Sequence, residues 1–288
     1  MHANNLLLVG SWQMYHAPDD LNDALRTLSE AGGKVIAGGT DVYPSSQQGQ
    51  TPPSFLDVTR ISGLRDISQS DKGVRIGAAV TWTDVIRADL PPAFVALKQA
   101  AREVGSVQIQ NAGTIAGNLC NASPAADGVP PLLALDASVE LESKDRGPRR
   151  LPLSDFITGV RETELANDEL LTAILIPSPP VEMKSAFEKL GSRRYLVISI
   201  TMTAALVSCD NTGNVTEARI AVGACSPVAQ RLPELEASLL GQSIGDVTID
   251  PAHLARLAPI DDVRGSMDFR FDVVSAQIVR AIKRAGQA

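Results

Sequence analysis

The sequence is poor in the residues that bind metal ions and form disulfides. Its 288 residues include three cysteines, which are widely spaced and form no CxxC pair. This spacing excludes an iron–sulfur cluster held only by cysteines of this chain and argues against a disulfide framework. The three histidines are scattered and lie beside no other metal-ligating cluster, so we expect no metal site. These residues are Cys120, Cys209, Cys225, His2, His16 and His253.

Long apolar runs and an excess of positive charge are also missing. No run of about eighteen apolar residues occurs, so we expect no membrane span. Residues 1–14 hold a four-residue apolar run with no basic region before it, which is not the pattern of a signal peptide. The formal net charge of −7 argues against a nucleic-acid or anionic-membrane partner. The composition is that of a globular protein, and its few cysteines fit a reducing cytoplasm.

Neither of the two common glycine motifs for nucleotide binding occurs in the chain. Both GxGxxG and GxxxxGK[ST] are missing, so the sequence does not predict a Rossmann fold. A different glycine-bearing stretch is present at residues 35–42, which read VIAGGTDV. Its three apolar residues indicate a short buried strand, and the glycine pair that follows indicates a sharp turn.

A second unusual stretch covers residues 111–128, which read NAGTIAGNLCNASPAADG. It contains no long charged side chain and one carboxylate, Asp127. Small residues let the backbone approach a ligand and direct N–H groups at an anion, while an acid can accept from a hydroxyl. The stretch therefore predicts a loop that cradles a ligand with phosphate and sugar groups. On composition alone, a surface loop rich in glycine and alanine is an equal alternative.

Together the two stretches resemble the FAD-binding medium subunit of the molybdenum hydroxylases, the family of xanthine dehydrogenase and carbon monoxide dehydrogenase. In that family AGGTD follows a short strand, and a pattern close to T-[IL]-G-G-N-[IL]-x-x-A-S-P-x-x-D comes later. Residues 114–127 match it except that Ala116 replaces the first glycine of the pair. Alanine is tolerated there only where the backbone needs no positive φ. Further matches extend the likeness over nearly the whole chain.

The resemblance implies a set of cofactor-binding residues and no catalytic side chain. The glycine turn would contact the FAD diphosphate, Asp127 would accept from a ribityl hydroxyl, and Lys189 would lie near the flavin pyrimidine edge. The scattered histidines suggest no covalent link, so FAD would be held non-covalently. The implied residues are Val35, Ile36, Ala37, Gly38, Gly39, Thr40, Asp41, Val42, Val104, Thr114, Gly117, Asn118, Ser123, Asp127, Leu171 and Lys189.

Several of these residues have a structural alternative. Asp41 and Asp127 can cap turns, Val104 and Leu171 can be core residues, and Lys189 can be a solvated surface lysine. Tyr195 could lie over the flavin, while Arg193 and Arg194 could face a partner subunit instead. Cys120, inside the main motif, is expected to be a small packed residue and not a reactive thiol. The run from Asp262 to Arg270 is interpreted as structural.

The expected fold class is α+β. Residues 1–178 would form a two-subdomain FAD-binding domain of the vanillyl-alcohol-oxidase-like (PCMH) type. Residues 179–288 would form an α+β C-terminal flavoprotein domain with an antiparallel sheet, and the boundary is placed at the PSPP linker, residues 177–180. Strands are expected at 35–40, 55–58, 73–80, 137–141, 151–156, 169–176, 184–190, 197–207 and 217–222. Helices are expected at 21–31, 82–87, 91–104, 232–240 and 271–284.

The function implied by the resemblance is electron transfer within a cytoplasmic molybdenum hydroxylase. A large subunit would carry the molybdenum cofactor and a small subunit two [2Fe–2S] clusters, in a heterotrimer or a dimer of heterotrimers. The medium subunit would take electrons from the clusters and pass them to NAD, oxygen or another acceptor. Two alternatives remain open: a self-sufficient FAD-dependent oxidoreductase with the same cofactor fold, and a scaffold subunit that has lost its flavin. The sequence does not identify the organic substrate.

Overall fold

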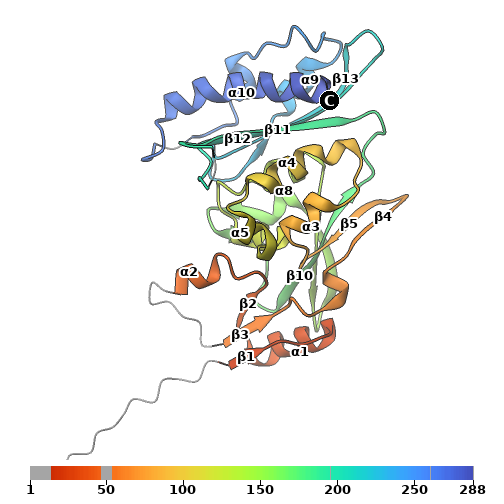
Figure 1. Ribbon diagram of the computed structural model, residues 1–288, viewed down its shortest axis with the longest axis vertical. Coiled ribbons are helices and arrows are strands. Elements are labelled where there is room, and N and C mark those ends of the chain that lie inside the picture. The colour runs from red at the N-terminus through yellow and green to blue at the C-terminus, as the bar shows by residue number, and fades with distance from the viewer. Residues whose placement is uncertain (1–13, 47–53, 195, 260, 288) are drawn as a thin grey trace, which may run out of the picture.

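The protein is described from a computed structural model, which covers residues 14–46, 54–194, 196–259 and 261–287. Figure 1 shows three units stacked along the long axis: a small N-terminal unit, a central unit with a five-stranded sheet, and a C-terminal unit carrying the longest helix. The described residues form three clusters of buried apolar side chains, and the largest extends from the central unit into the C-terminal sheet. The expected α+β architecture with an antiparallel C-terminal sheet is confirmed.

The N-terminal unit is a three-stranded parallel sheet in the order β1-β3-β2 with one helix packed on it. Asp20 caps helix α1 by accepting a hydrogen bond from the Asp23 N–H (2.9 Å). Helix α1 buries its apolar face. The helix ends at Ala31, and the chain turns at Gly32, where φ is +64°. The elements are β1 (Met14–His16), α1 (Leu21–Ala31), β2 (Lys34–Ile36), α2 (Val42–Ser46) and β3 (Ser54–Asp57).

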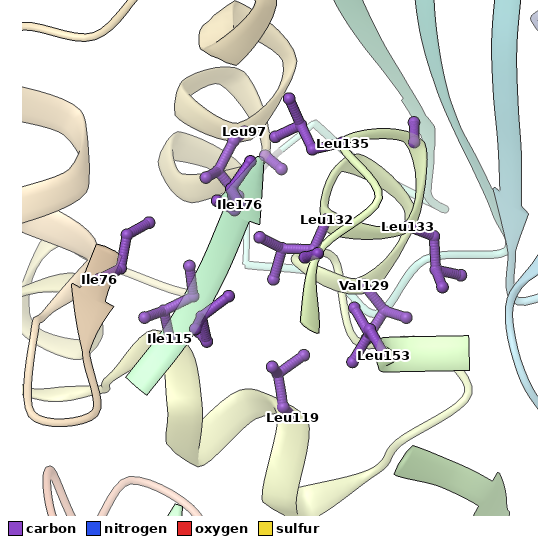
Figure 2. Close-up of a cluster of buried hydrophobic side chains, with 14 of the residues drawn as sticks. Ile76, Leu97, Ile115, Leu119, Val129, Leu132, Leu133, Leu135, Leu153 and Ile176 are labelled. Carbon is purple, nitrogen blue, oxygen red and sulfur yellow. The ribbon is translucent and has the colours of Figure 1, made fainter. Parts of the chain in front are cut away.

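The central unit is an antiparallel sheet in the order β4-β5-β10-β6-β7, with short helices packed against it. Figure 2 shows part of its core, in which Ile115, Leu119, Leu132 and Ile176 are among the buried apolar side chains and Leu97 lies beside Ile176. The strands are β4 (Ile67–Ser70), β5 (Gly73–Gly77), β6 (Ser138–Ser143), β7 (Gly147–Pro152), β8 (Ile157–Gly159), β9 (Glu162–Thr163) and β10 (Glu169–Pro177). The helices are η1 (Ser62–Leu64), α3 (Trp82–Arg87), η2 (Pro92–Phe94), α4 (Val95–Glu103), α5 (Val107–Ala112), α6 (Ile115–Asn121), α7 (Val129–Ala134) and α8 (Leu153–Phe156).

The C-terminal unit is an antiparallel sheet in the order β11-β12-β13-β14. Helix α10 packs along strands β11 and β12, while α4 and α7 of the central unit contact β11, β12 and β13. The sheet therefore joins the two units, and strand β12 is buried along nearly its whole length. The elements are β11 (Lys184–Leu190), β12 (Thr201–Cys209), β13 (Val215–Gly223), β14 (Gln230–Arg231), α9 (Pro233–Leu239), η3 (Pro251–Leu254) and α10 (Met267–Gln287).

The local predictions fail mainly where tertiary contacts decide the backbone. The stretch at 111–128 was expected to be a loop, but it contains the end of α5 and all of α6. The strand expected at 151–156 ends at Pro152 and is followed by helix α8, and the strand expected from 197 begins at Thr201. The division at residues 178 and 179 stays a prediction.

Candidate functional site

A cavity of about 950 Å³ lies where the three units meet. This volume is within the range of small-molecule and cofactor sites, roughly 300–1,000 Å³. The N-terminal unit contributes residues 34–42. The central unit contributes Trp82, Ile109, residues 104–105 and 160–161, and part of residues 113–127. The C-terminal unit contributes residues 196–199, part of residues 224–227, and Asp262, Arg264 and Arg270. The site is therefore assembled from segments distant in sequence.

The first glycine stretch forms one wall of the cavity because it follows β2 and turns sharply. Gly39 has φ of +68°, and a Cβ placed on it would lie 2.3 Å from the Tyr43 ring. The Tyr43 N–H donates to the Gly39 carbonyl (3.0 Å) and closes the turn. Only glycine satisfies both constraints, so the backbone itself faces the cavity here.

The two glycine-bearing stretches touch each other. A Cβ on Gly38 would lie 1.8 Å from the Ala112 carbonyl oxygen and 2.7 Å from the Gly113 nitrogen. A Cβ on Gly113 would in turn lie 3.2 Å from the Thr40 hydroxyl oxygen. The close approach of two backbones, some seventy-five residues apart, therefore depends on Gly38. The expected convergence of the two stretches is present, and both line the same cavity.

Helix α6 fixes the path of the second stretch. Thr114 caps the helix by accepting from the Gly117 N–H (3.0 Å), and the Ile115 N–H donates to the Val80 carbonyl (3.1 Å). Ala116 is buried in the core and has no positive φ. This explains why alanine is accommodated where the family pattern has glycine: its methyl group faces the core, while Gly117 lines the cavity.

One polar atom in the cavity wall lacks a partner. The Asn118 side-chain oxygen is buried and accepts no hydrogen bond from any described residue. It lies next to Gly128, where a Cβ would be 3.0 Å from that oxygen and 2.5 Å from the Trp82 ring. A buried unsatisfied acceptor costs about 1–3 kcal/mol. The wall is therefore suited to a ligand that supplies a hydrogen-bond donor.

Asp127 is held by a buried ion pair that spans two units. The Lys189 ammonium lies 2.7 Å from Asp127 Oδ2, and the Ser199 hydroxyl donates to Asp127 Oδ1 (2.6 Å). The side chains of Lys189 and Asp127 are only 6% and 8% exposed. Burial raises the pKa of the Asp127 carboxyl above its usual range, while Lys189 and Ser199 oppose that shift by stabilising the carboxylate.

Cys120 lines the cavity as an unreactive thiol. Desolvation raises its pKa to about 12, with a small opposing effect of Lys34. The thiolate is the nucleophilic form, so at neutral pH this cysteine is nearly always the protonated thiol. The expectation of a packed cysteine without nucleophilic reactivity agrees with this environment.

The C-terminal unit contributes charged residues that the sequence did not assign to the site. Arg270 is fully buried at the start of α10 and donates to the carbonyls of Ile200 and Ala224 (2.9 Å to Ala224) and to Asp262 (2.7 Å). Asp262, Arg264 and Arg270 all line the cavity. The run from Asp262 to Arg270 is therefore structural, as interpreted, and is also part of the cavity wall.

Two of the residues assigned by resemblance do not line the cavity. Leu171 lies on β10 within the apolar core of the central unit, which was its structural alternative. Lys189 is buried, so a solvated surface position is wrong, but it lines a second cavity of about 450 Å³. The other fourteen residues line the main cavity. Tyr195 lies outside the described residues, and Arg193 and Arg194 line the second cavity.

The sequence also missed Trp82, Arg161 and Ser199, which line the cavity. Trp82 stands beside the hydroxyl-capped start of α3, and Arg161 donates to the Asn121 side chain from a turn where its own φ is +64°. No local pattern marks these residues, because each reaches the site through a contact distant in sequence. Within the described ranges, no group of three acidic, cysteine or histidine side chains is placed to hold a metal ion. None of the described helices is long and apolar enough to cross a membrane.

Comparisons with known proteins agree over nearly the full length. Residues 10–179 match the family model of the FAD binding domain in molybdopterin dehydrogenase, and residues 185–285 that of the CO dehydrogenase flavoprotein C-terminal domain. The chain is 32% identical over 279 residues to the xanthine dehydrogenase FAD-binding subunit of Escherichia coli O157:H7, covering 94% of this chain and 95% of that subunit.

A second relative and a solved structure extend this similarity. The 6-hydroxypseudooxynicotine dehydrogenase complex subunit alpha of Paenarthrobacter nicotinovorans is 32% identical over 282 residues, covering 94% of this chain and 93% of that subunit. The structure of a carbon monoxide dehydrogenase from Hydrogenophaga pseudoflava, which lacks the Mo-pyranopterin moiety of its molybdenum cofactor, contains a similar chain. The two superpose with a TM-score of 0.85 at 28% identity, covering 94% of this chain and 96% of that chain.

Proposed function

The chain belongs to the family of FAD-binding subunits of molybdenum hydroxylases, and from this premise we propose that it transfers electrons between partner subunits and a final acceptor. It is an oxidoreductase subunit with FAD as its cofactor. In the proposed complex, a small partner carries [2Fe–2S] clusters and a large partner carries the molybdenum cofactor. Electrons would reach the FAD from the clusters and leave to NAD, oxygen or another acceptor.

The convergence of the two glycine-bearing stretches on one cavity is the observation that carries the proposal. The backbone at Gly38, Gly39 and Thr40 would face the diphosphate, since this wall presents main-chain groups without bulky side chains. Asp127 would accept a hydrogen bond from a cofactor hydroxyl. The Asn118 side-chain oxygen, which has no partner among the described residues, would accept one from another donor. The residues present therefore fit a dinucleotide cofactor.

The cavity offers little support for substrate chemistry by this chain alone. Asp127 is engaged by Lys189 and Ser199, and Asp262 by Arg264 and Arg270. Neither of these two carboxylates is a free base in this arrangement, and Cys120 is protonated. Asp41, the third carboxylate of the wall, is exposed and lies on the glycine turn that we propose to face the diphosphate. Bound FAD would supply the redox chemistry, while the residues of this chain bind and orient it. This favours a subunit that carries electrons over a self-sufficient oxidoreductase.

An apolar rim beside the cavity supports a protein partner. We define this rim as Val107, Ile109, Val160, Leu196 and Ile198, all of which are at least 36% exposed. All but Val107 line the cavity itself, and Val107 lies two residues before Ile109 on α5. Exposed apolar groups that cluster next to a functional site are typical of contact surfaces. We propose that this rim meets the electron-donating partner, and the free cysteines fit assembly in the cytoplasm.

Purification of the chain alone tests the proposal in two steps. A flavin absorption band, and FAD released on denaturation, is expected, whereas a colourless chain that takes up no added FAD would favour the scaffold alternative. The flavoprotein should then show no hydroxylase activity until both partner subunits are added. Full activity of the chain by itself with a small organic substrate would favour the self-sufficient enzyme.

A further inference from the structure

The C-terminal end of helix α6 is held by the tip of the β8–β9 hairpin. Helix α6 ends at Asn121, and Ala122 after it has φ of +45°. The Arg161 N–H donates to the Ala122 carbonyl (2.9 Å) from the hairpin tip, where the φ of Arg161 is itself +64°. Left-handed backbone is unfavourable for residues other than glycine. This bend therefore forms because contacts distant in sequence fix it.

Unfavourable backbone conformations of this kind are concentrated at the main cavity. Among the described residues, five other than glycine have positive φ, and three of them, Arg161, Leu196 and Ala224, line the cavity. Ala122, a fourth, lies between two residues of the cavity wall. Such strain persists where the surrounding structure fixes the backbone, and it is frequent at ligand sites. The bend after α6 is therefore a candidate for a feature that positions a ligand-binding group.

The Arg161 side chain determines how the Asn121 amide is oriented. The guanidinium donates to the Asn121 side-chain oxygen and reaches the Asn121 backbone carbonyl (3.4 Å). A guanidinium has only donors, so the amide oxygen faces it and the amide nitrogen is directed away from it. Asn121 is half-buried in the cavity wall, and its amide nitrogen donates to no described residue. Two N–H donors are therefore available to a ligand in the cavity.

Positive charge gathers at the same end of the cavity. Lys34, at the start of β2, and Arg161 both line it. Lys34 opposes the rise in the pKa of Cys120, which precedes Asn121, so its ammonium acts at the C-terminal end of α6. Hydrogen-bond donors combined with positive charge favour an anionic ligand group. In FAD the adenosine diphosphate half carries the phosphates, whereas the oxidised flavin ring is neutral, so this end of the cavity suits the adenosine diphosphate half.

We propose that Asn121 donates a hydrogen bond to the adenosine diphosphate half of the cofactor and that Arg161 is the positioning residue that orients its amide. The inference rests on the proposed FAD site. In the family pattern, Asn121 occupies the second of the two unspecified positions before the Ala-Ser-Pro run. The contact is therefore an addition made by this chain to the motif, and the rest of the motif is independent of it.

A purely structural role of Arg161 makes a different prediction. A cation beside the last carbonyls of a helix stabilises its C-terminus, and the bonds to Asn121 are of this type. Capping alone would change the melting temperature of the chain and leave its affinity for ligands unchanged. The positioning role instead changes the affinity for ligands that contain adenosine diphosphate, and it does so only while the Asn121 amide is present.

Asn121→Ala in the full chain tests the contact itself. Dissociation constants are measured with the flavin-free chain, by fluorescence titration for FAD and by competition for ADP. Both should rise by about tenfold, since a hydrogen bond to a charged group is lost. Asn22→Ala, at an exposed position of α1 outside the cavity wall, is the matched control and should bind both ligands as the parent does.

Two results would overturn the contact. Unchanged affinity of Asn121→Ala for both ligands would show that the amide does not bind the cofactor. A loss of FAD affinity without a loss of ADP affinity, or a parent chain with which ADP does not compete, would contradict its assignment to the adenosine diphosphate half.

Arg161→Gly tests the positioning role without removing the backbone bond. Glycine tolerates the positive φ and keeps the N–H that donates to Ala122, so this variant should fold. The dissociation constants for FAD and ADP should rise by about threefold or more, because the amide loses the partner that orients it. In the Asn121→Ala background, the same change should alter them by less than about twofold. Equal losses in both backgrounds would mean that the guanidinium contacts the ligand directly, which would overturn the positioning role.

Arg150→Met is the control for the loss of one positive charge. Arg150 is an exposed residue of β7 and does not line the cavity, so this variant should match the parent in affinity for FAD and ADP. Thermal unfolding of the same preparations reports stability separately. A lower melting temperature of Arg161→Gly with unchanged affinities would support the capping role and refute the positioning role.

The outcome also separates this inference from the proposed function. A parent chain that takes up no FAD would refute the proposed function and with it this inference. A parent chain that binds FAD, with the Asn121 and Arg161 variants equal to it in affinity, would refute this inference alone.

Discussion

Gly38→Ala is expected to separate the two walls of the proposed FAD cavity. The added Cβ would lie 1.8 Å from the Ala112 carbonyl oxygen and 2.3 Å from its carbon, both of which are backbone atoms. Backbone cannot move aside by a change of rotamer, so the turn after β2 and the end of α5 must shift apart. Overpacking of this kind costs about 1–3 kcal/mol of unfolding free energy. For a chain of this size, the melting temperature should fall by roughly 2–12 °C.

The loss of FAD affinity should exceed what the loss of stability explains. The shift moves the two stretches that we propose to contact the diphosphate, so we expect at least a tenfold higher dissociation constant, about 1.4 kcal/mol. The assays are fluorescence titration with FAD and thermal unfolding of the flavin-free chain, both on the same preparation. Binding is compared well below the melting temperature, where the variant is folded.

Gly63→Ala provides the matched control for this prediction. A Cβ at Gly63 meets no atom within 4 Å, and the residue has no positive φ. Alanine there should leave FAD affinity unchanged and stability equal or slightly higher, since it reduces the entropy of the unfolded chain. If Gly38→Ala bound FAD as tightly as the parent and the control, the contact between the two stretches would not support the site, and our reasoning would be wrong.

Two further variants and one labelling experiment test other parts of the structure. Arg270→Met leaves Asp262 and the carbonyls of Ile200 and Ala224 without their buried donor. The free energy of unfolding, measured by urea titration, should therefore fall by about 3–5 kcal/mol. A loss below about 1 kcal/mol would mean that these hydrogen bonds are not formed. Cys120, with a pKa of about 12, should react with iodoacetamide at neutral pH far more slowly than a free thiol in the same assay, and rapid labelling of the folded chain would contradict its environment. Val107→Asp should weaken co-purification with the proposed partner subunits, because Val107 lies on the apolar rim. The FAD content of the chain should stay the same, since Val107 does not line the cavity. Unchanged assembly would mean that the partner binds elsewhere.

The sequence determined the family, the cofactor and several local structures because these are carried by short stretches of residues. Asp20 and the spacing of Leu21, Ala24, Leu25 and Leu28 specify α1, and the chain forms that helix with that cap. The two glycine-bearing stretches indicated an FAD subunit without the fold being known. Glycine and small polar residues at those positions restrict the backbone locally, so the motif can be identified from the sequence without knowledge of distant contacts.

Only the tertiary structure decided the backbone conformation of these stretches and the distant partners of their side chains. Helix α6 forms where composition suggested a loop, because Ile115 and Leu119 pack into the core shown in Figure 2 and bring the cavity-facing residues with them. The same is true of Lys189, whose ammonium is buried against Asp127, sixty-two residues away. Neither the alternation of residues along a strand nor the residue type predicts which distant residue a side chain will contact. That partner is fixed when the central and C-terminal units dock, since burial of a charge requires its counter-charge to arrive in the same place.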